Sequence, residues 1–279
     1  MQLKQRQNKA NNDMFLDPSW RILTVGDGDL SFSHAIARHI KPTKLVASTY
    51  DDANTIEQKY ADNALTALQQ LNVTTLTEFD VTKPDSWLHL VDARFDVVIF
   101  QFPLIPAFKG EAAFKANTQQ GGMNVLNRAL LHRYLDYASQ FALDKNGPML
   151  CYITSKDVKP YREWNIEGSL NKGLNCHYLG QMPFDINLFP GYKIRNVDRD
   201  KHVKDTSGIT YVFSEKTDNN ITTKLTLPAY LGDKHCALCR VGPYMAQEDE
   251  DKHLLSKKHK QMEKFEQDWQ AWLAQNNEE

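Results

Sequence analysis

Short apolar runs alternate along this chain with longer stretches in which apolar residues recur every three or four positions. The runs are typical of buried strands, and the spaced pattern is typical of helices that pack one face on a core. The expected strands are residues 22–25, 44–50, 73–79, 95–102, 148–154 and 208–214. The expected helices are residues 35–40, 55–71, 86–91 and 125–143. This alternation predicts an α/β fold, a Rossmann-like doubly wound and mostly parallel sheet with helices on both faces.

The same pattern divides the chain into four parts. We expect a disordered polar tail over residues 1–19, an α/β domain over 20–216, a polar linker over 217–232 and a small C-terminal unit over 233–279. Within the α/β domain, residues 105–122 have little periodicity, which predicts a long loop that closes over the strand ends.

Composition limits the partners. Lys and Arg number 33 against 35 Asp and Glu, with a formal net charge of −2, so a surface for RNA must be local. No segment has the length and apolarity of a membrane span or signal peptide, so we expect no membrane partner and a cytoplasmic location, nucleolar if the cell is eukaryotic. The four cysteines then favour a metal site over disulfides. Oligomeric state is left open, with a monomer favoured.

The most informative segment is the turn Gly26-Asp27-Gly28-Asp29, between the first strand and the first helix. A glycine turn that joins a strand to a helix builds a nucleotide-sized site. The two acids would repel a pyrophosphate but attract a ligand that carries an amino group and a sulfonium charge. This favours S-adenosylmethionine over NAD, and Ser31 stands where the third glycine of the dinucleotide pattern would be.

Polar residues also follow the next strands. Asp51, after the second strand, is placed to accept hydrogen bonds from ribose hydroxyls, and Asp80, after the third, from an adenine amino group. Gln101 ends the fourth strand and would face the transferable methyl and the acceptor. Each acid alone could instead cap a helix or end a strand, and Asp52 is better explained as an N-cap. Their common position at successive strand ends is what favours a cofactor site.

Several of these segments resemble one known family. Gly-Asp-Gly-Asp-Leu-Ser-Phe-Ser, Ser-Thr-Tyr-Asp and Phe-Asp-Val-Val-Ile-Phe-Gln-Phe-Pro are similar to motifs of the eukaryotic 25S rRNA (uridine-N3)-methyltransferase-like proteins, and the resemblance spans residues 21–214. It implies a class I, S-adenosylmethionine-dependent RNA methyltransferase that modifies a base nitrogen of rRNA or other structured RNA. It also implies that the cofactor is contacted by Asp51 and by Gly26, Asp27, Gly28, Asp29, Ser31, Phe32 and Ser33.

The chain departs from this family after the fourth strand. Gln101-Phe102-Pro103-Leu104 stands where the family usually has Asn-Phe-Pro-His. We expect Gln101 to hold the edge of the acceptor base and Pro103 to stiffen the turn, and we name no general base. The departure keeps an alternative open, a non-catalytic RNA- or protein-binding module with a relic Rossmann core. Further on, Tyr192 and Arg195 begin a basic stretch that suits single-stranded RNA, although such runs are often solvated loops.

The C-terminal unit carries a metal-ligand pattern. Cys236 and Cys239 are separated by two residues, thirteen more lead to His253, and five more lead to His259. Two cysteines and two histidines at such spacing make a structural zinc site, against the alternative of a chance thiol pair and two surface histidines. The segment resembles U1-type or matrin-type fingers, which implies binding of structured RNA.

The finger could also bind protein or pack on its own domain. Its last helix is expected to continue through Phe265, Trp269 and Trp272, an apolar stripe that predicts docking.

Overall fold

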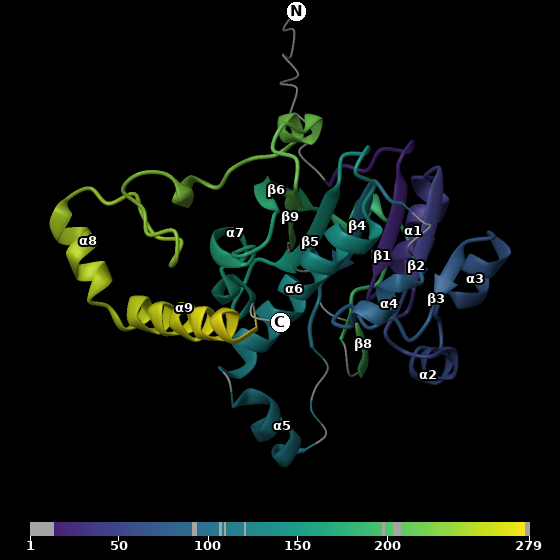
Figure 1. Ribbon diagram of the computed structural model, residues 1–279, viewed down its shortest axis with the longest axis horizontal. Helices are drawn as coiled ribbons and strands as arrows, with labels where there is room; N and C mark the ends of the chain where they lie inside the picture. Colours follow the sequence, from purple (N-terminus) through teal and green to yellow (C-terminus); the bar gives the residue numbers. More distant parts are fainter. Residues whose placement is uncertain are drawn as a thin grey trace, which may run out of the picture.

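The computed structural model describes residues 14–90, 94–105, 108, 110–119, 121–196, 199–202 and 208–276. Among these residues, one sheet of seven strands forms the centre of the molecule, in the order β3-β2-β1-β4-β5-β9-β6 (Figure 1). The strands are β1 (Arg21–Val25), β2 (Lys44–Ser48), β3 (Thr74–Leu76), β4 (Val97–Gln101), β5 (Leu150–Lys156), β6 (His177–Phe184) and β9 (Gly208–Ser214).

The direction of the strands confirms the expected fold class. The pairs β2–β3, β1–β2, β1–β4 and β4–β5 are parallel, whereas β9 runs antiparallel to both β5 and β6. Because the chain winds outward from β1 in both directions, the β1–β4 boundary is the topological switch point, beyond which ligands bind in sheets of this kind.

Helices cover both faces of the sheet. One face packs against α4 (Pro84–Leu88), α6 (Gly122–Tyr137), the π-helix η1 (Ala138–Ala142) and α7 (Ile166–Ser169). The other packs against α1 (Ser31–His39) and the N-terminal residues Met14 and Leu16. The remaining described elements are α2 (Ala53–Lys59), α3 (Leu65–Gln70), α5 (Glu111–Thr118), η2 (Tyr161–Trp164), η3 (Ile186–Leu188), β7 (Arg195–Asn196), β8 (Arg199–His202), η4 (Asn220–Lys224), η5 (Ala229–Leu231), α8 (Gln247–Leu254) and α9 (Lys257–Asn276).

Three expected elements differ in the structure. The single helix expected over residues 55–71 is two helices, α2 and α3, because the turn between them is held by the Ala64 amide, which donates to the Asp29 carbonyl. The loop expected over 105–122 contains α5. Strand β6 was not expected, because Gly180 and Pro183 interrupt its pattern, as an edge strand allows.

The expected tail and linker are also partly ordered. Met14 and Leu16 are buried in the core although they fall within the expected tail, and residues 1–13 lie outside the described part of the chain. In the linker, Ile221 is buried, and Thr226 exchanges two backbone hydrogen bonds with Gln181 of β6. The linker is therefore packed on the sheet edge rather than free.

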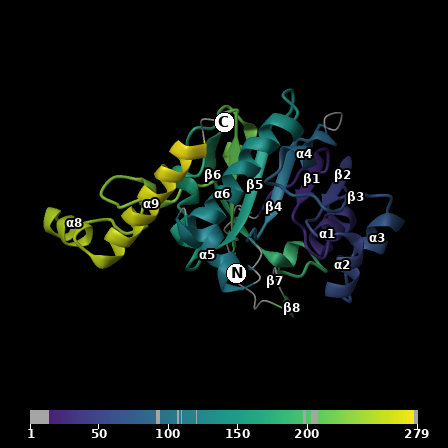
Figure 2. The same cartoon turned by 60° about the horizontal axis from the view of Figure 1, so that its bottom comes forward.

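The last helix, α9, lies along α6 (Figures 1 and 2). Trp269, Trp272 and Leu273 pack with Val125 and Ala129 of α6 in one buried cluster. The expected docking of this stripe is thus confirmed, and the surface that receives it belongs to the chain's own α/β domain. Along the described residues, no helix has both the length and the apolarity needed to cross a membrane.

An ion pair fastens α9 to α6. Arg128, fully buried, donates to Glu266 at 2.8 Å and lies 4.9 Å from the centre of the Trp269 ring. Burial alone would raise the pKa of Glu266, but the Arg128 charge and hydrogen bonds from Arg128, Asn165 and Ser169 lower it to about 2. A carboxyl group whose pKa is lowered on folding stabilises the protein above its unfolded pKa, and that contribution is lost as pH falls from about 4.5 toward 2.

We therefore expect Glu266→Gln to lower the free energy of unfolding by about 3 kcal/mol at pH 7, because it leaves the buried Arg128 charge uncompensated. The difference from wild type should shrink at pH 3. Urea unfolding followed by tryptophan fluorescence measures both values. Asp268→Asn, which breaks the exposed Lys264–Asp268 pair on the same helix, is the control and should cost no more than about 0.5 kcal/mol. An equal loss in both variants would contradict this account of the buried pair.

Candidate functional site

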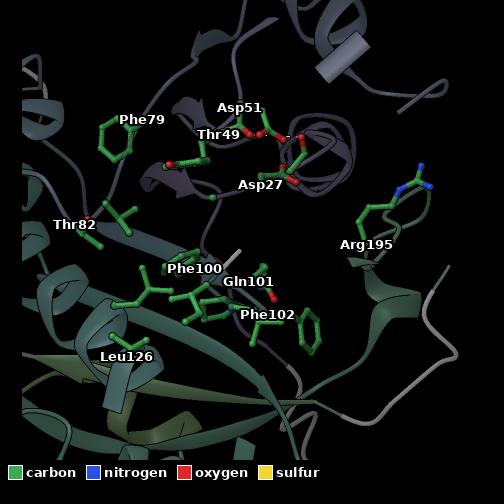
Figure 3. Close-up of a pocket in the computed structure, with 18 of the residues that line it drawn as sticks. Asp27, Thr49, Asp51, Phe79, Thr82, Phe100, Gln101, Phe102, Leu126 and Arg195 are labelled. Carbon is green, nitrogen blue, oxygen red and sulfur yellow. Dashed lines mark hydrogen bonds between the residues drawn. The ribbon is translucent and has the colours of Figure 1, made fainter. Parts of the chain in front are cut away.

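A cavity of about 930 Å³ opens at the carboxyl ends of β1, β2 and β4. Its volume is at the upper end of the range of about 300–1,000 Å³ typical of small-molecule sites. Figure 3 shows Asp27, Thr49 and Asp51 on one side of the end of β4 and Leu126 on the other. The structure brings together in its lining most of the residues expected from sequence, namely Gly26, Asp27, Gly28, Asp29, Asp51, Gln101 and Pro103.

Gly26 is required by the shape of this turn. Its φ is +63°, a left-handed conformation that favours glycine, and a Cβ there would lie 2.4 Å from Cε2 of Phe100. The turn can therefore lie this close to the end of β4 only because residue 26 has no side chain.

Asp27 is a buried carboxylate at the floor of the turn. Its Oδ2 accepts hydrogen bonds from the amide of Ser33 at 2.7 Å and from the hydroxyl of Ser33 at 2.5 Å. Burial, and then the neighbouring charge of Asp29, raise the pKa of Asp27 well above its usual range, although the Ser33 bonds partly offset this shift. A cation in the cavity would stabilise the charged form.

Asp29 is held by two groups from different parts of the chain. Its Oδ1 accepts from the Ser31 amide at 3.0 Å, and its Oδ2 accepts from Nε of Arg195 at 2.6 Å. Arg195 also pairs with Asp62 and lies 5.6 Å from the centre of the Tyr60 ring. The Arg195 side chain, considered above as an RNA contact, is therefore directed at an acid of the cavity.

Asp51 lies where the second strand leads into the next helix. Its Oδ2 pairs with Nζ of Lys59 at 3.0 Å, and both residues line the cavity. The next residue, Asp52, caps α2 by accepting from the amide of Thr55, as expected. Two adjacent aspartates thus have different positions, one in the cavity and one at a helix end.

Four of the expected cofactor residues lie outside the lining. Ser31 accepts a hydrogen bond from the Lys193 amide, Ser33 supports Asp27, and Phe32 packs on Phe189 and Tyr192. The carboxylate of Asp80 turns back to the amide and hydroxyl of Thr82. The structure therefore gives these residues positions behind the cavity wall, whereas Phe79, Val81 and Thr82 around Asp80 do line it.

The end of β4 carries an unusual arrangement. Gln101 is buried, its Nε2 lies 3.5 Å from Sδ of Met14, and its Oε1 has no hydrogen-bond partner among the described protein atoms. Phe102 follows with a φ of 46°, a conformation that is costly for a non-glycine residue and is found most often at functional sites. Pro103 comes next and also lines the cavity.

The wall beyond β4 was missed by sequence reasoning. It is built from Leu126, Leu130 and Arg133 of α6 together with Trp272 and Asn276 of α9. The tryptophan stripe signalled that α9 docks on something, but no pattern in the sequence says which surface receives it.

The four expected metal ligands also meet. One ligand atom from each of Cys236, Cys239, His253 and His259 lies within 4.8 Å of all the others. Nδ1 of His259 is 3.5 Å from both sulfurs, while its Nε2 is 3.3 Å from Glu263. The two histidines come from different helices, His253 from α8 and His259 from α9.

Comparisons with known proteins give one family. The model of the family described as "BMT5-like: rRNA (uridine-N3-)-methyltransferase BTM5-like" matches residues 23–196. A curated relative, "Heavy metal-associated isoprenylated plant protein 41" of Arabidopsis thaliana, is 30% identical over 181 residues, or 64% of this chain and 33% of that protein. The chain thus spans about a third of the length of this relative.

Two solved structures show more distant similarity. TrmN from Thermus thermophilus has a TM-score of 0.40 and 12% identity, and the match covers 72% of this chain and 45% of TrmN. The 30S ribosomal A1408 methyltransferase from an uncultured bacterium has a TM-score of 0.41 and 13% identity, with 71% and 88% covered.

The buried Asp27 makes stability depend on pH. Because its pKa is raised on folding, the group costs stability as pH rises above its unfolded pKa of about 3.8, and the cost is complete above its folded pKa. We expect Asp27→Asn to raise the melting temperature of the ligand-free protein at pH 8 by at least about 2 °C, the shift that about 1 kcal/mol produces in a chain of this size. At pH 4 the variant and wild type should melt together. Thermal unfolding at the two pH values measures this, and a variant less stable at pH 8 would contradict it.

Proposed function

Because the chain belongs to the BMT5-like family of rRNA (uridine-N3-)-methyltransferases, we propose that it transfers a methyl group from S-adenosylmethionine to a base nitrogen of rRNA or other structured RNA, with uridine N3 as the first candidate. The observation that carries this proposal is the pair Asp27 and Asp29, in a glycine turn that lines a cavity at the switch point of the sheet. A site with buried acids attracts a cationic cofactor and disfavours a pyrophosphate.

The residues present fit this cofactor. Its methyl is bound to a positively charged sulfur, and this supplies the electrophile when the cofactor is bound. Asp27 and Asp29 would attract the amino group and the sulfonium, and Asp51 would accept hydrogen bonds from the ribose hydroxyls. Gly26 leaves room for close approach, since a Cβ there would meet Phe100. Phe79, Val81 and Thr82 would surround the adenine in place of the Asp80 carboxylate, which is turned away.

The acceptor side needs orientation and exclusion of water. Gln101 Oε1 is a buried acceptor without a hydrogen-bond partner among the described residues, so a donor of a bound ligand would satisfy it. The rigid turn at Phe102 and Pro103 would fix that contact. Uridine N3 must lose its proton before it attacks, and no described residue of the cavity lining is a histidine. Positioning of the base at Gln101 is therefore the proposed contribution of these residues, and no residue is assigned as the acceptor of the N3 proton.

The proposed substrate sets the proposed location. An enzyme of rRNA acts where rRNA is made or assembled, which is the cytoplasm, or the nucleolus of a eukaryotic cell.

We expect Asp51→Ala to weaken S-adenosylmethionine binding by about 100-fold, because it removes charge-assisted hydrogen bonds worth about 1.5–3 kcal/mol each. Isothermal titration calorimetry of the purified chain measures this value. Asp52→Ala is the matched control: it removes the cap of α2 without changing the cavity lining, so its affinity should equal that of wild type. Equal affinities in all three proteins would contradict the assignment of Asp51.

The reaction itself is tested with RNA from cells that lack the protein. The purified chain and methyl-labelled S-adenosylmethionine should label this RNA, and nucleoside mass spectrometry should identify the product as 3-methyluridine. Binding of the cofactor with a different methylated nucleoside would keep the reaction class and replace the base. Binding of neither S-adenosylmethionine nor NAD would favour the relic RNA- or protein-binding module instead.

We further propose that the Cys236, Cys239, His253 and His259 cluster holds a structural zinc ion. Two thiols and two imidazoles are the donor set of such sites. His253 Nε2 is buried and has no hydrogen-bond partner within the described part of the chain, and a metal bond would satisfy it. Glu263 engages His259 Nε2 and leaves Nδ1 directed at the thiols, as outer contacts of metal-bound histidines usually do.

Purified wild-type protein should then contain one zinc ion per chain by elemental analysis, and Cys236→Ser should contain almost none. Cys176→Ser, which changes a buried thiol outside the cluster, should keep the full amount and controls for loss through misfolding. Zinc content that is the same in the three proteins would rule out this ligand set.

A further inference from the structure

We infer that the C-terminal helix α9 is part of the acceptor site, with Trp272 and Asn276 forming the wall against which the acceptor nucleotide of the RNA lies. This inference rests on the proposed function and deepens it. The finger would then be a fixed part of the active site rather than a tethered module that only captures RNA.

The first support is that α9 is fastened in place. Besides the pair with Arg128, Glu266 accepts from Asn165 and Ser169, and Nε1 of Trp269 donates to the Ser169 carbonyl at 3.0 Å. Trp269 is fully buried, and its ring is stacked on that of Trp272 at 5.0 Å with 8° between the planes. These contacts hold α9 against both α6 and α7, so the position of its last turn is fixed by buried groups.

The second support is where the last turn ends. Trp272 and Asn276 line the same cavity as Asp27 and Asp51, although more than 220 residues separate them in the chain. The side-chain Nδ2 of Asn276 donates a hydrogen bond to the backbone carbonyl of Trp272 at 2.9 Å, and this bond holds the Asn276 side chain against the end of the helix. Arg133 of α6 lies 5.5 Å from the centre of the Trp272 ring and lines the cavity beside it.

The third support is the difference between the two sides of the cavity. The carboxylates of Asp27, Asp29 and Asp51 gather at the ends of β1 and β2, while the wall from α6 and α9 is apolar and aromatic with the Arg133 cation at its edge. Trp272 is 6% exposed and one face of its ring is stacked on Trp269, so it gives the cavity an apolar ring edge. An apolar edge beside an amide and a guanidinium suits a nucleobase attached to phosphate, because the amide can pair with the base edge and arginine contacts the backbone. The acidic side suits the cationic cofactor, so the two ligands would meet at Gln101 between them.

The helix that forms this wall also carries one residue of the metal cluster. Helix α9 contains 20 residues and so extends about 30 Å, with His259 of the metal cluster in its first turn and Trp272 near its end. The same rigid helix would thus carry both the RNA-binding finger and the acceptor wall. RNA held by the finger would be held at a fixed distance from the cavity.

The test uses the full-length chain, saturating S-adenosylmethionine and RNA from cells that lack the protein. We expect Asn276→Ala and Trp272→Ala each to raise the KM for RNA, Trp272→Ala by about tenfold, because each variant removes a side chain that lines the acceptor side of the cavity. The dissociation constant for S-adenosylmethionine should stay within about twofold of wild type, and the zinc content should not change. Trp272→Phe, which keeps an aromatic ring, should restore most of the lost affinity for RNA.

Leu273→Ala is the matched control, because Leu273 packs in the same cluster as Trp272 but does not line the cavity. A KM raised by Asn276→Ala and Trp272→Ala, and not by Leu273→Ala, supports the inference. It is overturned if Asn276→Ala leaves the KM unchanged, or if Leu273→Ala raises it as much as Trp272→Ala, since the effect would then come from docking alone. Either result leaves methyl transfer by the wild type, and hence the proposed function, intact. A wild type that binds the cofactor and methylates no RNA overturns both.

Discussion

The cost of burying two carboxylates side by side is the constraint on which the site depends. Asp27 and Asp29 are both nearly inaccessible to solvent, and like charges so close raise the free energy of the ionised state. The fold offsets part of this cost through Ser33, which donates two hydrogen bonds to Asp27, and through Arg195, which pairs with Asp29. What remains is the cost of ionising Asp27, whose pKa stays well above its usual range. A bound cationic cofactor would stabilise the ionised carboxylate, so the free energy that the free protein loses here would add to the affinity for the cofactor.

The buried charge of Arg128 has a different environment. Arg128 meets Glu266, whose carboxylate also accepts hydrogen bonds from Asn165 and Ser169, while Nε of Arg128 has no hydrogen-bond partner among the described residues. Such a network fixes one arrangement of its partners. The two sites therefore differ in their carboxylates: the raised pKa of Asp27 marks a charge that a bound cation can stabilise, and the lowered pKa of Glu266 marks a charge that the chain itself stabilises.

This architecture brings the C-terminal finger into the α/β domain. Its helix is stacked on α6 through Trp269 and Trp272, and α6 in turn lines the cavity. The finger is therefore connected mechanically to the site through packed side chains, without a flexible segment in between. The residues expected to link the two parts, 217–232, also pack on β6, which restricts the finger from its other end.

The sequence by itself determined six of the seven strands of the sheet, the glycine turn and the meeting of two thiols and two imidazoles. These follow from local chemistry: apolar runs make buried strands, the turn at Gly26 needs a residue without a Cβ, and thiols and imidazoles at short spacing converge on one point. The sequence also distinguished the role of Asp52, a helix N-cap, from that of Asp51, because a helix N-cap has its own local sequence pattern.

Only the tertiary structure decided what depends on contacts between distant segments. The opposite wall comes from α6 and α9, Arg195 reaches Asp29 across 166 positions, and the Asp80 carboxylate turns back to Thr82. A periodic pattern shows that a helix face will be buried, but the partner of that face is set by packing complementarity and charge pairing between surfaces that exist only once the chain has folded.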